Sequence, residues 1–419
     1  MMIMVLLLLL LFVGTIIGRG EAPHEMVNRV HWSVVLFGVL LAYAMPNPFL
    51  GILTILVSLS AVAGGPKPQQ IMQYVYPALT VAAIYTAVAP FMDVWMIEPI
   101  LWGIGVVGCY LGIWCLYTTY FWVVQPWPPL LDPSPLAGGY EKVWRLGPFS
   151  WSFYDRQGAV AAGQGNPNHL EPLCVVSVAA WTGLFYLGSI GWGLYVPVVL
   201  LAVYPVALTM WGQQHITQGL VHLGTLAMAV LIVTYGWIGI AASVGYGIIG
   251  FLLLKPWAPS KEGHDSGRLR TWIGMLNEFW WKQPFPVKLF GTGTGTWVTL
   301  HIALSSHRHQ QSGEKELLMT CAHNEFVQCW VEQGMLGGLA LLSYCGASLW
   351  YASHAGPAGV AVALVAATLC SVAMLSFPWT LYHEVQWQEL DGRWLAKSFG
   401  NQGLVVMSLL TALLIEAVL

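Results

Sequence analysis

Long uninterrupted apolar runs constrain this chain more than any other feature. They are 15 to 24 residues long, from Ile3–Gly18 at the start to Gly403–Val418 at the end. In lipid, backbone polar groups must be satisfied within the protein, so only helices and closed barrels span a bilayer. Runs of this length without alternation favour helices, because a barrel strand needs only about ten residues with a two-residue period. The pattern predicts an all-α polytopic membrane protein.

Composition supports the same class. The chain is 57% hydrophobic and 8% charged, whereas soluble domains carry roughly 25% charged residues. Its 22 tryptophans and 17 tyrosines suit the two interfaces of a bilayer, where a ring lies in hydrocarbon and its polar edge meets headgroups. A net charge of −3 argues against nucleic acid. We therefore expect the lipid bilayer as the main partner.

Polar stretches separate the apolar runs into about 12 expected transmembrane helices. Each is close to the length that a helix needs to cross the hydrocarbon core of a bilayer. Pro46–Pro48 separates two of the early helices. The predicted organisation is N-terminal transmembrane helices at 1–122, a first polar loop at 123–171, central transmembrane helices at 172–254, a large, partly helical loop at 255–335 and C-terminal transmembrane helices at 336–419. An even number of helices separates the two loops, which therefore lie on the same side and can build one site.

The larger loop concentrates the cationic residues. Eight of the 16 Lys and Arg residues lie between Lys255 and Gly334. Arg268 and Arg270 precede a helix-like run, Thr271–Trp281. A guanidinium stays charged at any working pH and fits phosphate oxygens with two hydrogen bonds. The alternative for both arginines is anchoring to lipid headgroups.

A glycine run, Gly291–Thr296, reads GTGTGT. Glycine permits close backbone approach, and exposed amides such as those of Gly293 and Gly295 can hold an anion. The run lacks the Lys-Ser or Lys-Thr of a P-loop, and no strand precedes it. A flexible turn is the simpler interpretation.

His323 and Asn324 begin a segment with helical spacing, HNEFVQCWVEQG. A histidine with a pKa near 6.5 can take a proton from an attacking hydroxyl at neutral pH. The alternative is an interfacial histidine bonded to a nearby carbonyl. The cluster of His301, His307 and His309 has metal-like spacing, but its surroundings are typical of a solvated loop, and no metal site is predicted.

The first loop ends in GQGNPNHLEP, in which Pro167 and its flanking asparagines predict a turn that starts a helix. Asn168 lies in that turn. Arg156, ten residues ahead of Asn166, would either join an anion-binding site or remain in solvent.

Taken in order, these motifs resemble the O-antigen ligase and O-antigen polymerase family of bacterial envelope glycosyltransferases. The resemblance extends over about half of the chain, from Gly163 to Pro378. The matching segments are GQGNPN (Gly163–Asn168), SGRLRTW (Ser266–Trp272), LFGTGTG (Leu289–Gly295) and H-N-x₃-Q-x₃-E-x-G-x₂-G (His323–Gly337).

The resemblance implies metal-independent glycosyl transfer at the periplasmic face of the bacterial inner membrane, without a cofactor. The donor would be a glycan on a polyprenyl diphosphate, and the acceptor a glycolipid, another lipid-linked glycan or a protein hydroxyl. His323 would act as base on the acceptor, and Arg268 would stabilise the departing diphosphate. Residues expected along the substrate are Arg156, Asn168, Gln218, Arg270, Gly293, Gly295 and Asn324. The positive-inside rule alone would place the loops in the cytoplasm.

One position departs from the family pattern. The family carries Ser-Arg-Gly at the start of a middle helix, where this chain reads Thr217-Gln218-Gly219. Loss of that cation leaves a second interpretation open: a catalytically silent family member that serves as a structural or interaction subunit of the membrane. A related transferase that uses the same lipid carrier is a third interpretation.

The change Gln218→Arg tests this departure. A charge-assisted phosphate contact contributes about 1.5–3 kcal/mol, which in a transition state is roughly ten- to a hundredfold in rate. We expect Gln218→Arg to raise glycan transfer by that factor in a purified-protein assay. No gain, in a variant shown to be folded, would mean that another cation already fills this place or that the chain has a different activity.

Overall fold

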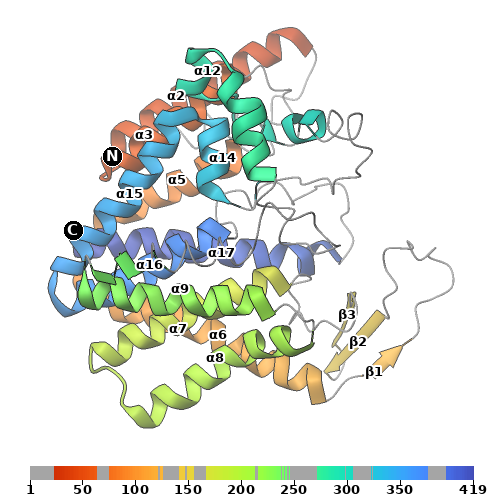
Figure 1. Cartoon of the computed structure of the whole chain (residues 1–419), viewed down its shortest axis with the longest axis vertical. Coiled ribbons are helices and arrows are strands. Elements are labelled where there is room, and N and C mark those ends of the chain that lie inside the picture. The colour runs from red at the N-terminus through yellow and green to blue at the C-terminus, as the bar shows by residue number, and fades with distance from the viewer. Residues whose placement is uncertain are drawn as a thin grey trace. The chain divides into compact units, whose positions relative to one another are not determined.

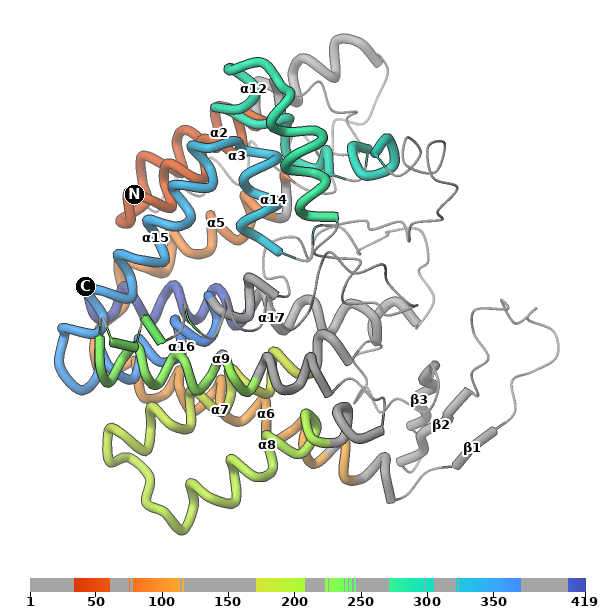
Figure 2. The backbone as a smooth tube through the Cα atoms, in the orientation of Figure 1, coloured from red at the N-terminus to blue at the C-terminus, as the bar shows by residue number. Residues whose placement is uncertain are grey.

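The computed structural model describes residues 23–63, 75–120, 123–125, 141–146, 149–154, 167–212, 216–236, 238–239, 241–242, 245, 271–297, 299–304, 322, 324–375 and 393–419. These residues are predominantly helical (Figure 1), which confirms the helical part of the predicted fold class. Figure 2 follows the same backbone and draws the remaining residues in grey. The helices fall into two compact units, each built from separated parts of the chain.

Unit 1 comprises Met1–Met92, Val244–Ser348 and Ala373–Val385. Its helices are α2 (Pro23–Ala44), α3 (Pro48–Ala63), α5 (Tyr76–Val88), η2 (Ala89–Phe91), η4 (Met275–Phe279), η5 (Trp280–Lys282), α12 (Phe285–Phe290), α14 (Glu325–Glu332) and most of α15 (Gly334–His354). As predicted, prolines separate α2 from α3. Asn47 caps α3, because its Oδ1 accepts hydrogen bonds from the backbone N–H groups of Phe49 and Leu50, at 3.1 and 3.3 Å.

Unit 2 comprises Asp93–Ser243, Leu349–Val372 and Gln386–Leu419. Its helices are η3 (Val94–Met96), α6 (Ile97–Tyr120), α7 (Pro167–Tyr186), α8 (Trp192–Gly212), α9 (Ile216–Tyr235), most of α16 (Gly356–Leu375) and α17 (Arg393–Val418). The start of α7 at Pro167 confirms the predicted helix-starting turn. Here α6, α7 and α8 pack against one another.

Small residues on α6 let these helices approach closely. Trp181 of α7 is buried and donates its indole N–H to the carbonyl of Gly105 at 2.8 Å. Ser177 donates to the carbonyl of Ile104 at 2.8 Å, and Gly112 lies against the backbone of Leu201 on α8. Close backbone approach at small residues and side-chain hydrogen bonds across helices are typical of membrane interiors.

A three-stranded antiparallel sheet was not predicted. Its strands, β1 (Val123–Gln125), β2 (Glu141–Leu146) and β3 (Phe149–Tyr154), lie in the order β1-β2-β3 within the expected first polar loop. In the register of β2 and β3, Trp144 is opposite Trp151. Aromatic and β-branched residues favour a pleated surface, and β2 and β3 are rich in such residues.

In the described ranges, two helices are long and apolar enough to cross a bilayer, Val94–Ile113 and Gly334–His354. Shorter apolar helices accompany them: Val34–Ala44, Pro48–Ser60, Ala78–Phe91, Glu171–Tyr186, Trp192–Ala207, Leu226–Tyr235, Gly356–Cys370 and Val406–Val418. The expected 12 spans and the five-part division into spans and loops therefore stay predictions.

Two glycines of α6 form a matched pair for testing the packing of unit 2. A methyl group at Gly112 would overlap the backbone carbonyl of Leu201, whereas one at Gly103 meets open space. We expect Gly112→Ala to cost about 1–3 kcal/mol of stability and Gly103→Ala to change it by less than about 1 kcal/mol. Thermal unfolding of the purified protein measures both, and an equal effect of the two changes would contradict this packing.

Candidate functional site

The structure describes part of the predicted site. Arg156, Arg268, Arg270 and His323 lie outside the described residues. For Asn168 in α7 and Gln218 in α9, the backbone is described. Gly293, Gly295 and Asn324 lie in unit 1, and all three belong to one hydrogen-bonded arrangement.

The glycine loop, residues 291–297, needs its glycines for backbone conformation. Gly291, Gly293 and Gly295 have φ angles of 84°, 113° and 80°. L side chains rarely adopt this region, and glycine enters it without steric cost. The alternating G-x-G-x-G spacing is therefore explained by the path of the chain itself.

This loop is fastened to the C-terminal end of α14. The backbone N–H of Thr292 donates to the carbonyl of Val331, and that of Gly293 donates to the carbonyl of Glu332, both at 3.0 Å. At Gly291 the two backbones are so close that a Cβ atom would overlap the carbonyl of Glu332. The loop and the helix end thus form a single unit of backbone structure.

The side chain of Glu332 is the centre of the arrangement. It is 3% exposed, and its Oε1 accepts hydrogen bonds from the backbone N–H of Trp297 at 3.0 Å and from Nε2 of Gln328 at 3.3 Å. The amides of Gly295 and of the Gln333 side chain are further donors. Burial raises the pKa of Glu332 from its ordinary value of 4.5 to about 7, and these hydrogen bonds oppose the rise.

Further hydrogen bonds connect the loop to α3. Nε2 of Gln333 donates to Oγ1 of Thr294 at 3.0 Å. The Thr294 hydroxyl lies 2.7 Å from that of Ser60 and donates to the carbonyl of Val57 at 3.0 Å. We call the side chains of Ser60, Thr294, Gln328, Glu332 and Gln333 the Glu332 network. It joins α3, the glycine loop and α14, and every member is buried.

Hydrogen bonds hold both sequence neighbours of His323, and one of these bonds is made by the Glu332 network. Oε1 of Gln328 accepts the backbone N–H of Ala322 at 3.1 Å, and the Ala322 carbonyl accepts the indole N–H of Trp272. On the other side, Oδ1 of Asn324 accepts the backbone N–H of Val327 at 3.1 Å and caps α14. The side chain of Asn324, predicted to bind substrate, is used in this cap.

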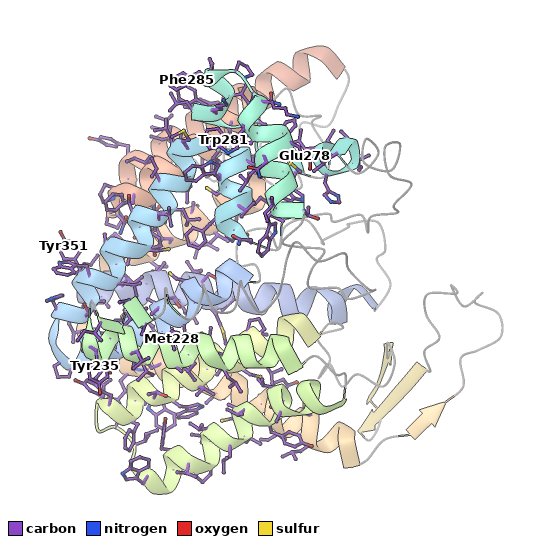
Figure 3. All side chains as sticks on the ribbon, viewed as in Figure 1. Met228, Tyr235, Glu278, Trp281, Phe285 and Tyr351 are labelled. Atoms are coloured by element: carbon purple, nitrogen blue, oxygen red, sulfur yellow. The ribbon has the colours of Figure 1, made fainter. Side chains whose placement is uncertain are left out.

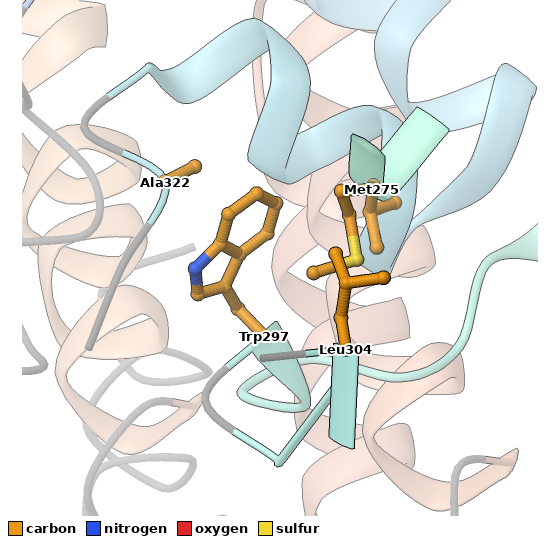
Figure 4. Close-up of a cluster of buried hydrophobic side chains, with 5 residues drawn as sticks. Met275, Trp297, Leu304 and Ala322 are labelled. Carbon is orange, nitrogen blue, oxygen red and sulfur yellow. The ribbon is translucent and has the colours of Figure 1, made fainter. Parts of the chain in front are cut away.

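A buried apolar cluster adjoins the network, because its members Trp297 and Ala322 donate backbone N–H groups to Glu332 and Gln328. Its members are Met275, Trp297, Leu304, Ala322 and Val331. Figure 4 shows the Trp297 ring between Ala322 on one side and Met275 and Leu304 on the other. Burial of a tryptophan side chain and its neighbours excludes water, which increases the strength of the polar contacts around Glu332.

The backbone N–H groups of Gly293 and Gly295 were expected to bind an anionic substrate. Within the described residues, the side-chain group that amides of the glycine loop contact is the carboxyl group of Glu332, so the ligand of this turn belongs to the chain itself. The sequence analysis missed Gln328, Glu332, Gln333 and Thr294. Their signal was present: Gln328 and Glu332 are polar residues four apart on one face of α14.

The described residues contain no group of three or more His, Cys, Asp or Glu side chains that could hold a metal ion. Of the three clustered histidines, His301 is fully buried. His307 and His309 lie outside the described residues.

Two glycines with similar backbone angles separate conformational strain from steric overlap. Gly291 has φ 84° and faces the backbone of Glu332, whereas Gly188 has φ 76° and open space around it. We expect Gly188→Ala to cost roughly 1–2 kcal/mol, and Gly291→Ala about 3 kcal/mol or more, because the loop must also leave α14. Thermal unfolding tests this order, and equal losses would contradict the close contact of loop and helix.

Comparison with known proteins assigns no family to this site. No family model matches the sequence, and no curated protein matches it. The residues of the Glu332 network and their geometry therefore carry the functional interpretation.

Proposed function

We propose that this chain is an O-antigen ligase-like glycosyltransferase of the bacterial inner membrane, which moves or polymerises a glycan from a polyprenyl-diphosphate carrier onto a lipid-linked or protein acceptor. The observation that carries the proposal is the meeting of three sequence motifs in one arrangement of unit 1. These motifs are Ser266–Trp272, Leu289–Gly295 and His323–Gly337, which are separated in the sequence by 16 or more residues.

A hydrogen bond joins the second motif to the third, and another joins the first motif to the residue that precedes the third. Trp272, the last residue of the first motif, donates its indole N–H to the carbonyl of Ala322, next to the start of the third. Gly293 of the second motif donates its backbone N–H to the carbonyl of Glu332 in the third. Motifs that serve one reaction must come together around one substrate, and this convergence supports the resemblance independently of motif order.

The proposed chemistry uses residues adjacent to these anchors in the sequence. The acceptor hydroxyl oxygen forms a bond to the anomeric carbon of the donor sugar, and the bond from that carbon to the diphosphate oxygen breaks. His323 takes the proton of the hydroxyl. Arg268, four residues before Trp272, stabilises the negative charge that passes to the polyprenyl diphosphate. The hydrogen bonds of Trp272, Ala322 and Asn324 hold residues that are near Arg268 and His323 in the sequence, and a held frame would favour catalysis by orientation.

The surface of α15 supports a membrane location. Leu336, Leu339 and Leu342 are exposed along one side of this helix, whereas Gly337, Gly338 and Ala340 are buried. A helix in water would expose polar residues at such positions. Large exposed aromatic residues, among them Trp281, Phe285, Tyr235 and Tyr351 in Figure 3, fit the interfacial belts of a bilayer. We propose that the chain crosses the inner membrane about 12 times, in line with its apolar runs, with its two polar loops in the periplasm.

One observation favours a second candidate function. Gln218, where the family has an arginine, supplies hydrogen bonds but no charge to a diphosphate. A silent family member that acts as a membrane structural or interaction subunit would retain the buried Glu332 network as architecture and lose the cation.

The decisive experiment is glycan transfer by the purified protein, reconstituted with a polyprenyl-diphosphate-linked glycan and a lipid-linked acceptor. We expect transfer by the wild type, and a loss of about 10²–10⁴-fold for His323→Ala, as for removal of a general base. Arg268→Ala should reduce transfer strongly as well, because removal of a transition-state charge contact costs about 10²–10³-fold.

The exposed His354 provides the matched control, and His354→Ala should transfer at the wild-type rate. Full activity of His323→Ala would contradict the proposed mechanism. Absence of transfer by a folded wild type with polysaccharide, glycolipid and peptide acceptors would favour the silent member.

A further inference from the structure

Glu332 is a buried carboxyl group whose described hydrogen-bond donors are all neutral. Two of them, the N–H groups of Gly295 and Trp297, belong to the glycine loop, and two, the side-chain amides of Gln328 and Gln333, belong to α14 and the residue after it. A carboxylate removed from water without a cation is costly to keep ionised. The Glu332 side chain therefore joins the glycine loop to α14, and the stability of this contact depends on whether the carboxyl group is ionised.

Resting on the proposed function, we propose that Glu332 is the positioning residue of this site, and that a proton bound to its carboxyl group closes the glycine loop onto α14. Loss of that proton favours an open loop in which the carboxylate is hydrated. The loop is thereby a proton-controlled element beside the residues that flank His323.

Thermodynamic linkage sets the direction. Burial in the closed arrangement raises the pKa of Glu332 to about 7, and hydration in an open loop returns it towards the ordinary value of 4.5. The closed form therefore binds the proton more tightly. Its advantage over the open form is fully present below pH 4.5 and is lost as the pH rises to about 7.

Gln328 transmits the state of this carboxyl group towards position 323. Its Nε2 donates to Glu332, and its Oε1 accepts the backbone N–H of Ala322. A shift of Glu332 that reorients the Gln328 amide must therefore strain or release the Ala322 contact. The protonation of Glu332 and the position of Ala322, which precedes α14, are therefore coupled through the side chain of Gln328.

The variant Glu332→Gln separates the response of this carboxyl group from that of the other titratable groups of unit 1. Cys329, on α14, has its pKa raised by burial, so its thiol stays neutral near pH 7. Ser60 and Thr294, which face the loop from α3 and from within it, do not titrate in this range. Remaining titratable or charged side chains on the surrounding described elements are Glu278, Lys282, Lys288, His301 and Glu325; of these, Glu325 and His301 are buried and Glu278 and Lys282 are exposed.

Hydrogen–deuterium exchange of the full-length protein in lipid nanodiscs tests the proposal. Backbone exchange in the segment 289–300 is measured at pH 5.5 and pH 7.5, with labelling times scaled for base-catalysed chemical exchange. In the wild type we expect the corrected exchange of this segment to be faster at pH 7.5 by on the order of tenfold. In Glu332→Gln, which cannot titrate but retains an acceptor oxygen, the change should be less than about twofold.

Glu278→Gln is the matched control, because it removes an exposed carboxyl group from the same unit. It should keep the wild-type response to pH. A wild-type segment whose corrected exchange is the same at both pH values overturns the proposal, whether or not Glu332→Gln folds. An unchanged response in a folded Glu332→Gln variant overturns it as well.

The exchange measurement needs neither donor nor acceptor, so its outcome is independent of glycan transfer. A wild type that shows the pH response but transfers no glycan would refute the proposed function alone. In an active wild type, Glu332→Gln should additionally flatten the pH profile of transfer between pH 5.5 and 7.5, which a merely structural role would not do.

Discussion

The hydrogen bond between the Glu332 carboxyl group and the backbone N–H of Trp297, 3.0 Å long, is the interaction on which the architecture of unit 1 depends. It joins Trp297, a member of the buried apolar cluster, to Glu332 of the polar network. Buried polar groups are tolerated when each has a partner, and here the partners come from different segments of the chain. A fully satisfied network of this kind specifies one arrangement of those segments, because any other leaves a buried group unpaired.

The backbone conformation of the glycine loop and the burial of the Glu332 carboxyl group depend on each other. The glycine loop adopts backbone angles that other residues avoid, and this brings its amides to one point. A diphosphate ligand and a buried glutamate can both use such amides, since the oxygens of both groups accept hydrogen bonds from N–H donors. A sequence pattern that resembles a phosphate-binding loop can therefore bind a carboxyl group of the same chain instead. Burial of that carboxyl group distinguishes the two cases.

The two units illustrate two ways of packing apolar helices. In unit 2, small residues of α6 bring backbones together, and Trp181 and Ser177 donate to carbonyls of that helix. In unit 1, polar side chains of the Glu332 network join a loop to helices α3 and α14. Both solutions satisfy polar groups away from water, the first through backbone carbonyls and the second through side chains and loop amides.

The sequence by itself determined the helical class, the break between α2 and α3, the start of α7 at Pro167 and the identity of the motifs. These follow from local rules: apolar periodicity, proline geometry and capping act within a few residues. Tertiary structure decided which motifs meet, because the Trp272–Ala322 and Trp297–Glu332 contacts join residues 50 and 35 positions apart. It alone also revealed that the loop amides serve Glu332, since the burial that raises the pKa of that carboxyl group is a property of the packed chain and not of any segment.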